Sequence, residues 1–581
     1  MQQGLPQGSV LATLLFLLFI NDLAPCIPEH IEGTMFADDL ALYVSHVKPD
    51  EACKLLQQGV TAVEDWSSTN KLDLNLVKSC TFFFTTNNKE AKYRPNITLG
   101  GKRMPFGDGP KELNPPFLGV IMDRSLAFTE HVRTVCKKVS KRCKMLGCLA
   151  SRSWGWHKQN LKGVYLAAQR SIMDYAAGGW QPWLSNTQIG KLEVTQDKCL
   201  RMITGQYANS HLDSIHLESG IPSYKCHSKV LIAIAYEKGM RAGTDQRRRI
   251  ALDKEVHHRL KTRSSLREMG KSLAQSLSLS SLERCPDPTP IIKPWSKPRK
   301  KNWYTLTNQE IKSDVPQILS TIDRQNADVT IYKDGSCSGG VQDGGAAAVI
   351  TTGPASSPVE LEVSQAKKSS LTTSYKEEDR ALNLGLEWVA THQDRSTVAF
   401  CTDSLSLLQA IGNLNPTTLH VRQRMEELNN FFNLLYVPGH KDVPGNELAD
   451  KWAKEAANLP GPCLDNSVKL GEAKSIVKRL IKDPPTSHPT ISKTYEGISQ
   501  ARDKSQVSSR KDSALLAQLR SGHHLSLGYY RNMLDETQSS SCSRCGSTSP
   551  DTVAHWLTEC VATLATWMEI FDRSKAAGHG T

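Results

Sequence analysis

Four acidic residues between Val329 and Ala457 constrain the fold of this chain more than any other feature of its sequence. They are Asp334, Glu378, Asp403 and Asp450. Asp334 ends the run Val-Thr-Ile-Tyr-Lys-Asp, whose alternating β-branched residues predict a strand that stops at Gly335. Asp403 closes a second predicted strand, residues 398–402. Because side chains just beyond strand ends face a cleft at the edge of a sheet, we expect these two aspartates to be neighbours.

A predicted helix positions the glutamate. Three apolar residues follow it with helical spacing and mark a buried face: Leu382, Leu386 and Val389. Glu378 stands four residues before Leu382 and shares this face. Its neighbours Glu377 and Asp379 are also acidic, so only the spacing to Ala381-Leu382 selects Glu378 among them.

The fourth acid follows a loop rich in proline and glycine. A strand is predicted at residues 434–437, after which the loop carries His440, and a helix starts near Asn446. This helix presents Asp450 one turn from its start. Since His440 has an ordinary pKa near 6.5, it is suited to proton transfer at neutral pH.

Crowded carboxylates repel one another unless cations lie between them. Mg²⁺ prefers oxygen ligands, and two such ions about 3.5–4 Å apart can hold the attacking water and the leaving oxygen of a phosphodiester cleavage. Each acid taken singly could equally be a solvated surface carboxylate or a charge at a helix N-terminus. All four in this order, with His440, favour a two-metal nuclease site.

The same residues carry a resemblance to the ribonuclease H family. Its motifs are Tyr-Lys-Asp-Gly-Ser, Ser-Tyr-x-x-Glu-x-x-Ala-Leu, Thr-Asp-Ser and Pro-Gly-His-x-x-x-x-Gly-Asn-Glu-x-Ala-Asp, within residues 328–460. The resemblance implies hydrolysis of the RNA strand of RNA/DNA hybrids, with the four acids binding two Mg²⁺ or Mn²⁺ ions. It further implies that Glu378 orients the attacking water or contacts the ribose 2′-hydroxyl, and that His440 assists proton transfer or product release.

Composition limits the class of protein. The chain has 581 residues, which suggests three or four domains, and a formal net charge of +12, which favours a polyanionic partner. Its 15 cysteines are mostly scattered singly, as is typical of a reducing compartment rather than of a secreted disulfide framework. The longest apolar run, residues 10–20, is too short to cross a bilayer, and no Lys or Arg precedes it. We therefore expect no membrane segment.

A second motif lies in residues 1–128. Asp38 and Asp39 stand between apolar segments, as at the turn of a β-hairpin, downstream of the loop Leu5-Pro6-Gln7-Gly8. A structural Asp-Asp turn is an equally good explanation of this pair by itself. With the loop, the segment resembles the palm of a non-LTR reverse transcriptase. That family uses a third aspartate from a preceding strand, which this sequence does not contain, so we expect no polymerase activity from this polypeptide alone.

Residues 129–245 are predicted to form a helical thumb and connection region. Apolar residues and lysines alternate over 130–149 as in an amphipathic helix with one basic face, which either tracks phosphates or is simply solvated. Residues 246–327 are predicted to form a basic, proline-rich linker. The cluster Lys297 to Lys301 within it is compatible with a nuclear-localisation patch, although basic linkers are commoner.

Residues 461–581 are predicted to form a helical tail with a metal motif. Its candidate ligands are Cys542, Cys545, His555 and Cys560. Two cysteines across a tight turn, followed by histidine and cysteine, have the spacing of a structural Zn²⁺ site, because four protein ligands leave no position for water. The alternative is a chance grouping of cysteines beneath a helix.

The whole pattern resembles the carboxyl-terminal part of an ingi-like non-LTR retrotransposon polyprotein. It predicts a multidomain α/β and α+β protein: a ribonuclease H-like mixed sheet of about five strands with flanking helices, a partial palm, a helical thumb and a small zinc module. Two alternatives remain: a piece of a longer, active RNA-directed DNA polymerase, and an inactive nucleic-acid-binding relic. The resemblance alone suggests residence in the nucleus.

Overall fold

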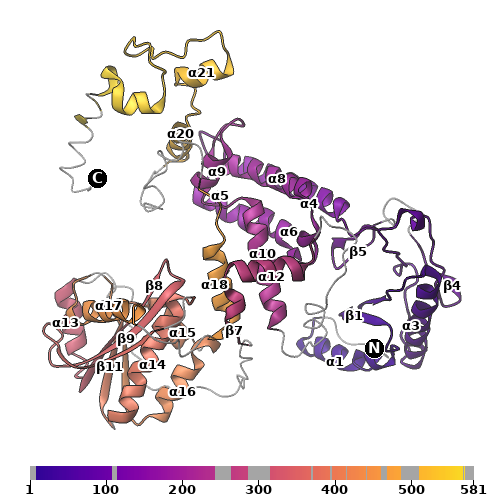
Figure 1. Ribbon diagram of the computed structural model, residues 1–581, viewed down its shortest axis with the longest axis horizontal. Helices are drawn as coiled ribbons and strands as arrows, with labels where there is room; N and C mark the ends of the chain where they lie inside the picture. The colour runs from indigo at the N-terminus through magenta and orange to yellow at the C-terminus, as the bar shows by residue number, and fades with distance from the viewer. Residues whose placement is uncertain are drawn as a thin grey trace. The chain divides into compact units, whose positions relative to one another are not determined.

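The computed structural model describes most of the chain (Figure 1). The described residues are 8–106, 114–241, 264–285, 314–367, 371–392, 395–413, 415–439, 441–459, 467–485, 509–564, 566 and 568–569. They form two compact units. The first comprises residues 1–176, 183–205 and 509–511, and the second comprises residues 177–182, 206–508 and 512–581.

A mixed five-stranded sheet forms the centre of the second unit, as the sequence predicts. Its order is β10-β9-β8-β11-β12. The strands are β8 (Val329–Ser338), β9 (Gln342–Thr352), β10 (Val359–Lys367), β11 (Thr397–Thr402) and β12 (Phe431–Tyr436). β8, β9 and β10 pair antiparallel, whereas β8, β11 and β12 run parallel. The parallel part places the carboxyl ends of β8 and β11 at one edge.

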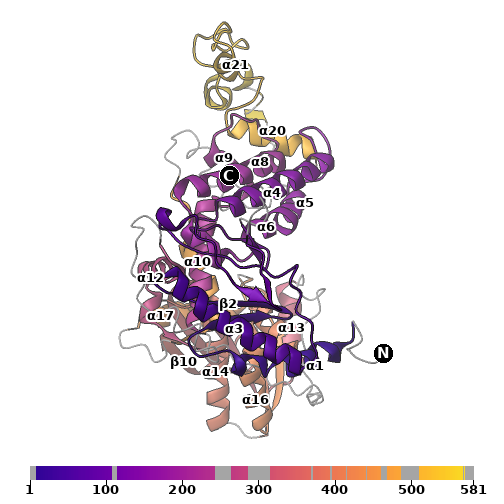
Figure 2. The ribbon, with the colours of Figure 1, turned by 90° about the vertical axis from the view of Figure 1, so that its right-hand side faces the viewer.

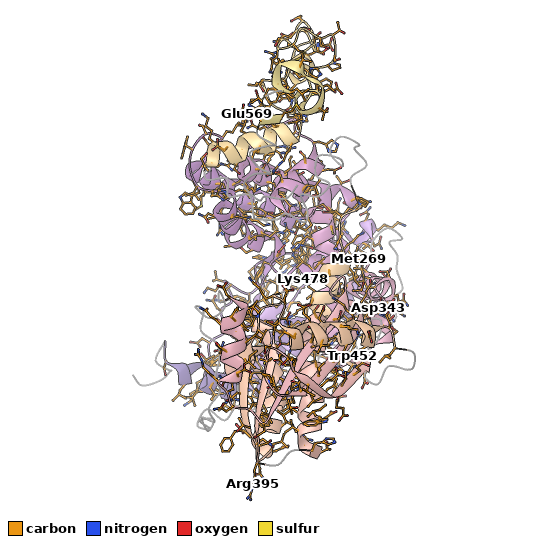
Figure 3. The ribbon with its side chains drawn as sticks, turned by 90° about the vertical axis from the view of Figure 1, so that its left-hand side faces the viewer. Met269, Asp343, Arg395, Trp452, Lys478 and Glu569 are labelled. Carbon is orange, nitrogen blue, oxygen red and sulfur yellow. The ribbon has the colours of Figure 1, made fainter. Side chains whose placement is uncertain are left out.

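Helices cover both faces of this sheet. They are α13 (Val315–Asp323), α14 (Ser374–His392), α15 (Leu405–Gly412), η6 (Pro416–Thr418), α16 (Leu419–Glu427) and α17 (Pro444–Ala457). On one face, Leu382, Leu386 and Val389 of α14 pack in a core with Ile331 and Phe400, which confirms the predicted buried face. α13 and α17 contribute to the core on the other face. In Figure 3, Arg395, which precedes β11, and Asp343 in β9 lie at opposite ends of this sheet.

The register of the parallel pair decides where the acids lie. Cys401 of β11 pairs with Tyr332 of β8. Two residues further along each strand, the same register brings Asp403 level with Asp334. The pairing of β8 with β11 is therefore enough to make Asp334 and Asp403 neighbours, as predicted.

The first unit begins with the segment resembling a palm. Its elements are α1 (Val10–Ile20), α2 (Leu23–Cys26), β1 (Glu32–Phe36), β2 (Asp39–Tyr43), α3 (Pro49–Thr69), η1 (Asn88–Glu90), β3 (Thr98–Leu99), β4 (Lys102–Arg103), β5 (Pro116–Phe117) and β6 (Val120–Ile121). β1 and β2 form an antiparallel hairpin with Phe36 opposite Asp39. Figure 2 shows α3 beside this hairpin, where Val63 and Trp66 of α3 pack on Ile20 and Leu23.

Helices follow from residue 129 onward, as predicted for the thumb and connection region. In the first unit they are α4 (Thr129–Leu149), α5 (Lys158–Val164), η2 (Tyr165–Arg170), α6 (Ser171–Asp174) and α8 (Asn186–Thr204). α4 buries Val132, Val135 and Val139 and exposes its lysines. The basic face predicted over 130–149 is therefore solvent-exposed.

The predicted linker is partly folded, which corrects its extent. α12 (Leu266–Ser276), η4 (Leu279–Ser281) and β7 (Glu283–Arg284) lie inside the range 246–327, as does α13. Ser265 and Glu268 form a capping box that starts α12, and Ala274 is buried. Residues 246–263 and 286–313, including the Lys297–Lys301 cluster, lie outside the described residues.

α12 belongs to a small helical group in the second unit. It packs with α10 (Tyr224–Met240) and α18 (Leu470–Leu480), and β7 pairs with β13 (Ser467–Val468). Val341 and Leu371 of the sheet domain join the same core. Met269 of α12 and Lys478 of α18 lie near each other in Figure 3. The first part of the predicted tail therefore packs on the sheet domain.

The remaining elements complete the second unit and the tail. They are α7 (Ala177–Trp180), η3 (Gln181–Trp183), α9 (Leu212–Ser219), α20 (Arg510–Arg520), α21 (Gly528–Leu534) and η7 (His555–Glu559). Of the helices in the described residues, none is both long enough and apolar enough to cross a bilayer.

Candidate active site

Three of the four predicted acids meet at the carboxyl edge of the sheet. Oxygens of Asp334, Glu378 and Asp403 all lie within 4.8 Å of one another. Asp334 comes from β8, Asp403 follows β11, and Glu378 lies on α14. They line a hollow of about 250 Å³ that is also lined by Asp450. The structure thus gathers on one surface the acids that the sequence spreads over more than a hundred positions.

Gly335 explains how α14 approaches the strand so closely. A Cβ atom at this position would lie 2.3 Å from the backbone nitrogen of Glu378 and 2.4 Å from the carbonyl carbon of Glu377. No side chain fits in this space, because the atoms it would meet are backbone. The glycine after Asp334 therefore lets the helix bring Glu378 to the aspartates.

For the hybrid cleavage that the resemblance to ribonuclease H implies, we predict that Gly335→Ala lowers the rate by about 100-fold, since a displacement of about 1 Å in an active site has an effect of this size. Single-turnover cleavage of a labelled hybrid measures it. Gly412→Ala is the matched control: Gly412 ends α15 in the same domain, and a Cβ there would meet no atom within 4 Å. Equal rates for both variants would show that the spacing between α14 and β8 does not matter.

The structure distinguishes Glu378 from its acidic neighbours. Glu377 is fully buried and accepts a hydrogen bond of 2.6 Å from the Thr372 hydroxyl. Asp379 lies 3.1 Å from the His420 ring nitrogen. Glu378 alone of the three is grouped with Asp334 and Asp403, and its carboxylate forms an ion pair with Lys333. Glu378, which the spacing to Ala381-Leu382 selects, is therefore the acid that faces the aspartates.

Asp450 occupies a more peripheral position than its three partners. It lies on α17 and lines the hollow, but it is not among the acids grouped within 4.8 Å. Its Oδ2 accepts a hydrogen bond of 2.5 Å from Lys454, one helical turn later. This contact engages one of the two carboxylate oxygens of Asp450, so its Oδ1 is the oxygen that could serve a cation held by the other three acids.

The carboxylates of the cluster repel one another, and bound cations would offset this repulsion. Burial, followed by the charges of Glu378 and Asp403, raises the pKa of Asp334 to about 8. A carboxyl group that keeps its proton at neutral pH binds metal only after releasing it. Oxygen-only donors at this spacing fit hard cations such as Mg²⁺ or Mn²⁺, whose charge offsets the repulsion.

A pH dependence follows for the metal-free protein. Asp334 has an ordinary pKa near 3.9 when unfolded and about 8 when folded, so between these values the folded state alone retains the proton. The contribution of Asp334 to the free energy of unfolding is fully present below about pH 4. It is lost as the pH rises towards 8. We predict that the melting temperature of metal-free wild type falls more steeply between pH 5 and 8 than that of Asp334→Asn. Parallel curves would contradict the assigned shift.

Two further residues bear on this site. His440 lies outside the described residues, so its predicted role remains a prediction.

Asn446, at the start of α17, lines the hollow, is only 5% exposed, and its Oδ1 accepts no hydrogen bond within the described part of the chain. It belongs to the Gly-Asn-Glu motif, but sequence reasoning gave it no role. Its buried acceptor is suited to a donor from bound water or substrate.

The four predicted zinc ligands also meet. Their ligand atoms all lie within 4.8 Å of one another. The sulfurs of Cys542 and Cys560 are 3.9 Å apart, and that of Cys545 is 3.4 Å from Nε2 of His555. A tetrahedral zinc ion with Zn–S bonds of about 2.3 Å needs sulfurs about 3.8 Å apart. The cluster therefore has the donor set and the spacing of a closed, structural zinc site.

Surrounding groups hold the ligand loops of this Cys/His cluster in place. Asp551 is fully buried, accepts a hydrogen bond of 2.8 Å from the Gly528 backbone nitrogen, and pairs with Arg544 at 2.6 Å. The Arg544 guanidinium stacks over Trp556, with its carbon 4.1 Å from the ring centroid. The Nδ1 atom of His555 lies 3.3 Å from Glu559, which orients the ring with Nε2 towards the cysteines.

Asp38 and Asp39 occupy the turn of the β1–β2 hairpin, where both are exposed. Among the residues with a described structure, no third acid is grouped with them at metal-binding distance. The predicted hairpin is present, and the pair lacks a third carboxylate in the part of the chain described.

Comparison with protein families finds a match in each of two separate parts of the chain. Residues 324–458 match the family described as RNase H, and residues 1–148 match the reverse transcriptase (RNA-dependent DNA polymerase) family. Among solved structures, RNase H1 from Halobacterium salinarum is 22% identical, with a TM-score of 0.19, covering 22% of this chain and 97% of that one.

Similar curated proteins come from transposons and mobile elements. The chain is 29% identical over 213 residues to a probable RNA-directed DNA polymerase from transposon BS of Drosophila melanogaster. It is 26% identical over 210 residues to the RNA-directed DNA polymerase from mobile element jockey of Drosophila funebris. Each match covers 35% of this chain and 22% of the relative, so the chain spans about a fifth of the length of these relatives.

The fold, the acidic cluster and the two family matches define a protein that contains a ribonuclease H domain and a reverse transcriptase segment. Over 35% of its length, the chain is also similar to RNA-directed DNA polymerases encoded by transposons.

Proposed function

We propose that the domain at residues 324–458 hydrolyses the RNA strand of RNA/DNA hybrids with divalent cations. The observation that carries this proposal is the grouping of Asp334, Glu378 and Asp403 within 4.8 Å, inside a segment that matches the RNase H family. Bound Mg²⁺ or Mn²⁺ would activate water and stabilise the leaving oxygen. The three acids would hold the cations, and Asp450, which lines the same hollow, would complete the set.

The other residues of the hollow bind and orient the substrate. Glu378, which lines the hollow, is placed to meet water or a ribose 2′-hydroxyl, the group that distinguishes RNA from DNA. Asn446 offers its buried carbonyl oxygen to a donor on the substrate, and His440 accepts or releases a proton. The partner is therefore an RNA/DNA hybrid rather than duplex DNA.

The test is a cleavage assay on four matched duplexes: RNA/DNA hybrid, RNA/RNA, DNA/DNA, and a hybrid in which the RNA strand carries 2′-deoxy residues at a defined position. We expect Mg²⁺-dependent cutting of the RNA strand of the hybrid alone, interrupted where the 2′-hydroxyl is missing. Equal cutting of RNA/RNA would overturn the proposed substrate, and binding of the hybrid without cutting would support the inactive relic.

RNA-directed DNA polymerisation is the second candidate function, favoured by the match of residues 1–148 to the reverse transcriptase family. Asp38 and Asp39 are its metal-binding remnant. Primer extension on an RNA template separates the candidates: we expect no nucleotide incorporation above background by this polypeptide alone. Incorporation that is lost in Asp38→Asn would establish the second function.

Three further proposals concern partners and place. The Cys/His cluster in the tail holds a structural Zn²⁺ and stabilises a nucleic-acid-binding tail. The exposed lysines of α4 contact phosphates, so binding to nucleic acid weakens as salt rises. The protein works in the nucleus, the compartment that its resemblance to retrotransposon proteins suggests.

A further inference from the structure

Lys333 is a buried lysine beneath the acidic cluster, and the reaction described above makes no use of it. It precedes Asp334 on β8 and is only 1% exposed. Adjacent strand residues point to opposite faces of a sheet, so Lys333 faces α14 whereas Asp334 faces α17. Lysine is almost never fully buried unless it is paired, which requires a partner on the α14 side.

That partner is Glu378. Nζ of Lys333 forms an ion pair with Oε2 of Glu378 and donates a second hydrogen bond, at 3.2 Å, to the backbone carbonyl of the same residue. One ammonium group thus contacts both the side chain and the main chain of Glu378. These contacts fix the rotamer of the glutamate and leave Oε1 as the oxygen that remains to meet a cation.

The charge of Lys333 opposes metal binding at the same time. A divalent cation and the ammonium group compete for one carboxylate, because each gains most of its stabilisation from the same negative charge. A neutral side chain of the same length would leave Glu378 buried with its charge unmatched, and a metal ion would be the nearest source of compensation.

We propose that Lys333 is a positioning residue and internal counterion that holds Glu378 ready in the metal-free protein and weakens divalent-cation binding through that residue. The proposal rests on the metal role of Glu378 given under the proposed function. It assigns Lys333 no contact with substrate or water.

The test measures Mn²⁺ binding, not cleavage, by the electron paramagnetic resonance signal of free Mn²⁺ titrated with the full chain. We expect Lys333→Met to bind Mn²⁺ at least tenfold more tightly than wild type. In a Glu378→Gln background, the same substitution should change affinity less than threefold, because the residue through which Lys333 acts has lost its charge. An unchanged or weaker affinity in Lys333→Met, or an equal gain in both backgrounds, would overturn the proposal.

Lys376 provides a matched control. It lies on the first turn of α14, its Nζ is 3.7 Å from Glu472, and it donates to the Ser467 carbonyl, so it is a half-buried paired lysine outside the cluster. Lys376→Met should leave Mn²⁺ affinity unchanged. If Lys376→Met and Lys333→Met raised the Mn²⁺ affinity equally, the effect would come from the change in net charge. That result would overturn the positioning role.

If Lys333→Met proves unstable, a second variant and a second measurement still test the proposal. Lys333→Gln is neutral and keeps a donor for the Glu378 carbonyl. For either variant we expect Mn²⁺ to raise the melting temperature by more than it does in wild type, and a smaller rise would contradict the proposal. If wild type binds Mn²⁺ with the expected coupling to Lys333 but cuts no hybrid, the counterion role stands and the proposed nuclease function fails.

Discussion

Asp403→Asn is expected to lower the rate of hybrid cleavage by about a thousandfold or more. Asparagine keeps the size of the side chain but removes one of the three grouped charges, and loss of about 4 kcal/mol of transition-state stabilisation corresponds to this factor. Binding of the hybrid in the absence of metal should not weaken, because the substitution removes a charge that repels phosphates. Single-turnover kinetics and fluorescence anisotropy measure the two quantities separately.

Asp379→Asn is the matched control for this substitution. Asp379 adjoins Glu378 on α14, but its carboxylate pairs with His420 and is not grouped with the other acids. Its cleavage rate should stay within about threefold of wild type, because this carboxylate neither joins the three grouped acids nor lines the hollow. A comparable loss in both variants would mean that general acidity, rather than the cluster, supports the activity.

Removal of zinc is the second large expected effect. Structural zinc contributes about 10–16 kcal/mol of binding free energy that is also folding free energy in small zinc modules. We expect Cys545→Ser to reduce bound zinc from one equivalent to less than about a tenth, and to abolish hydrogen-exchange protection over residues 526–563. Elemental analysis and hydrogen exchange with mass spectrometry measure both.

Cys148→Ser controls for the general loss of a cysteine, since Cys148 is exposed on α4 and lies outside the Cys/His cluster. Its zinc content should equal that of wild type. Protection that persists over 526–563 in zinc-free Cys545→Ser would show that the tail folds without metal and that the cysteines serve only its packing.

The sheet domain could be predicted from the sequence because its signals are local. Alternating residues mark β8, an apolar helical face marks α14, and the parallel register of β8 and β11 places Asp403 beside Asp334. The Cys/His spacing likewise predicts its own geometry, since a tight turn and one helical turn fix the distances between ligands.

Other features depend on packing that no local pattern reveals. Lys333 has the appearance of a solvated strand residue, and its burial follows only from the approach of α14 permitted at Gly335. Asp450 is not grouped with the other three acids and pairs with Lys454, an arrangement that spacing alone does not predict. α12 is hidden in a region rich in Ser, Leu and Arg, although the Ser265–Glu268 capping box was a readable signal.

The ends of the cleavage products test the central claim most directly. In an in-line displacement, water attacks phosphorus and the P–O3′ bond breaks, so the phosphate stays on the downstream fragment while the departing O3′ takes a proton. With Mg²⁺ and a hybrid labelled on its RNA strand, wild type should release 5′-phosphate and 3′-hydroxyl ends, and EDTA should stop the reaction. Products with 2′,3′-cyclic phosphates, or cutting that continues in EDTA, would contradict a nuclease site built on cations held by Asp334, Glu378 and Asp403.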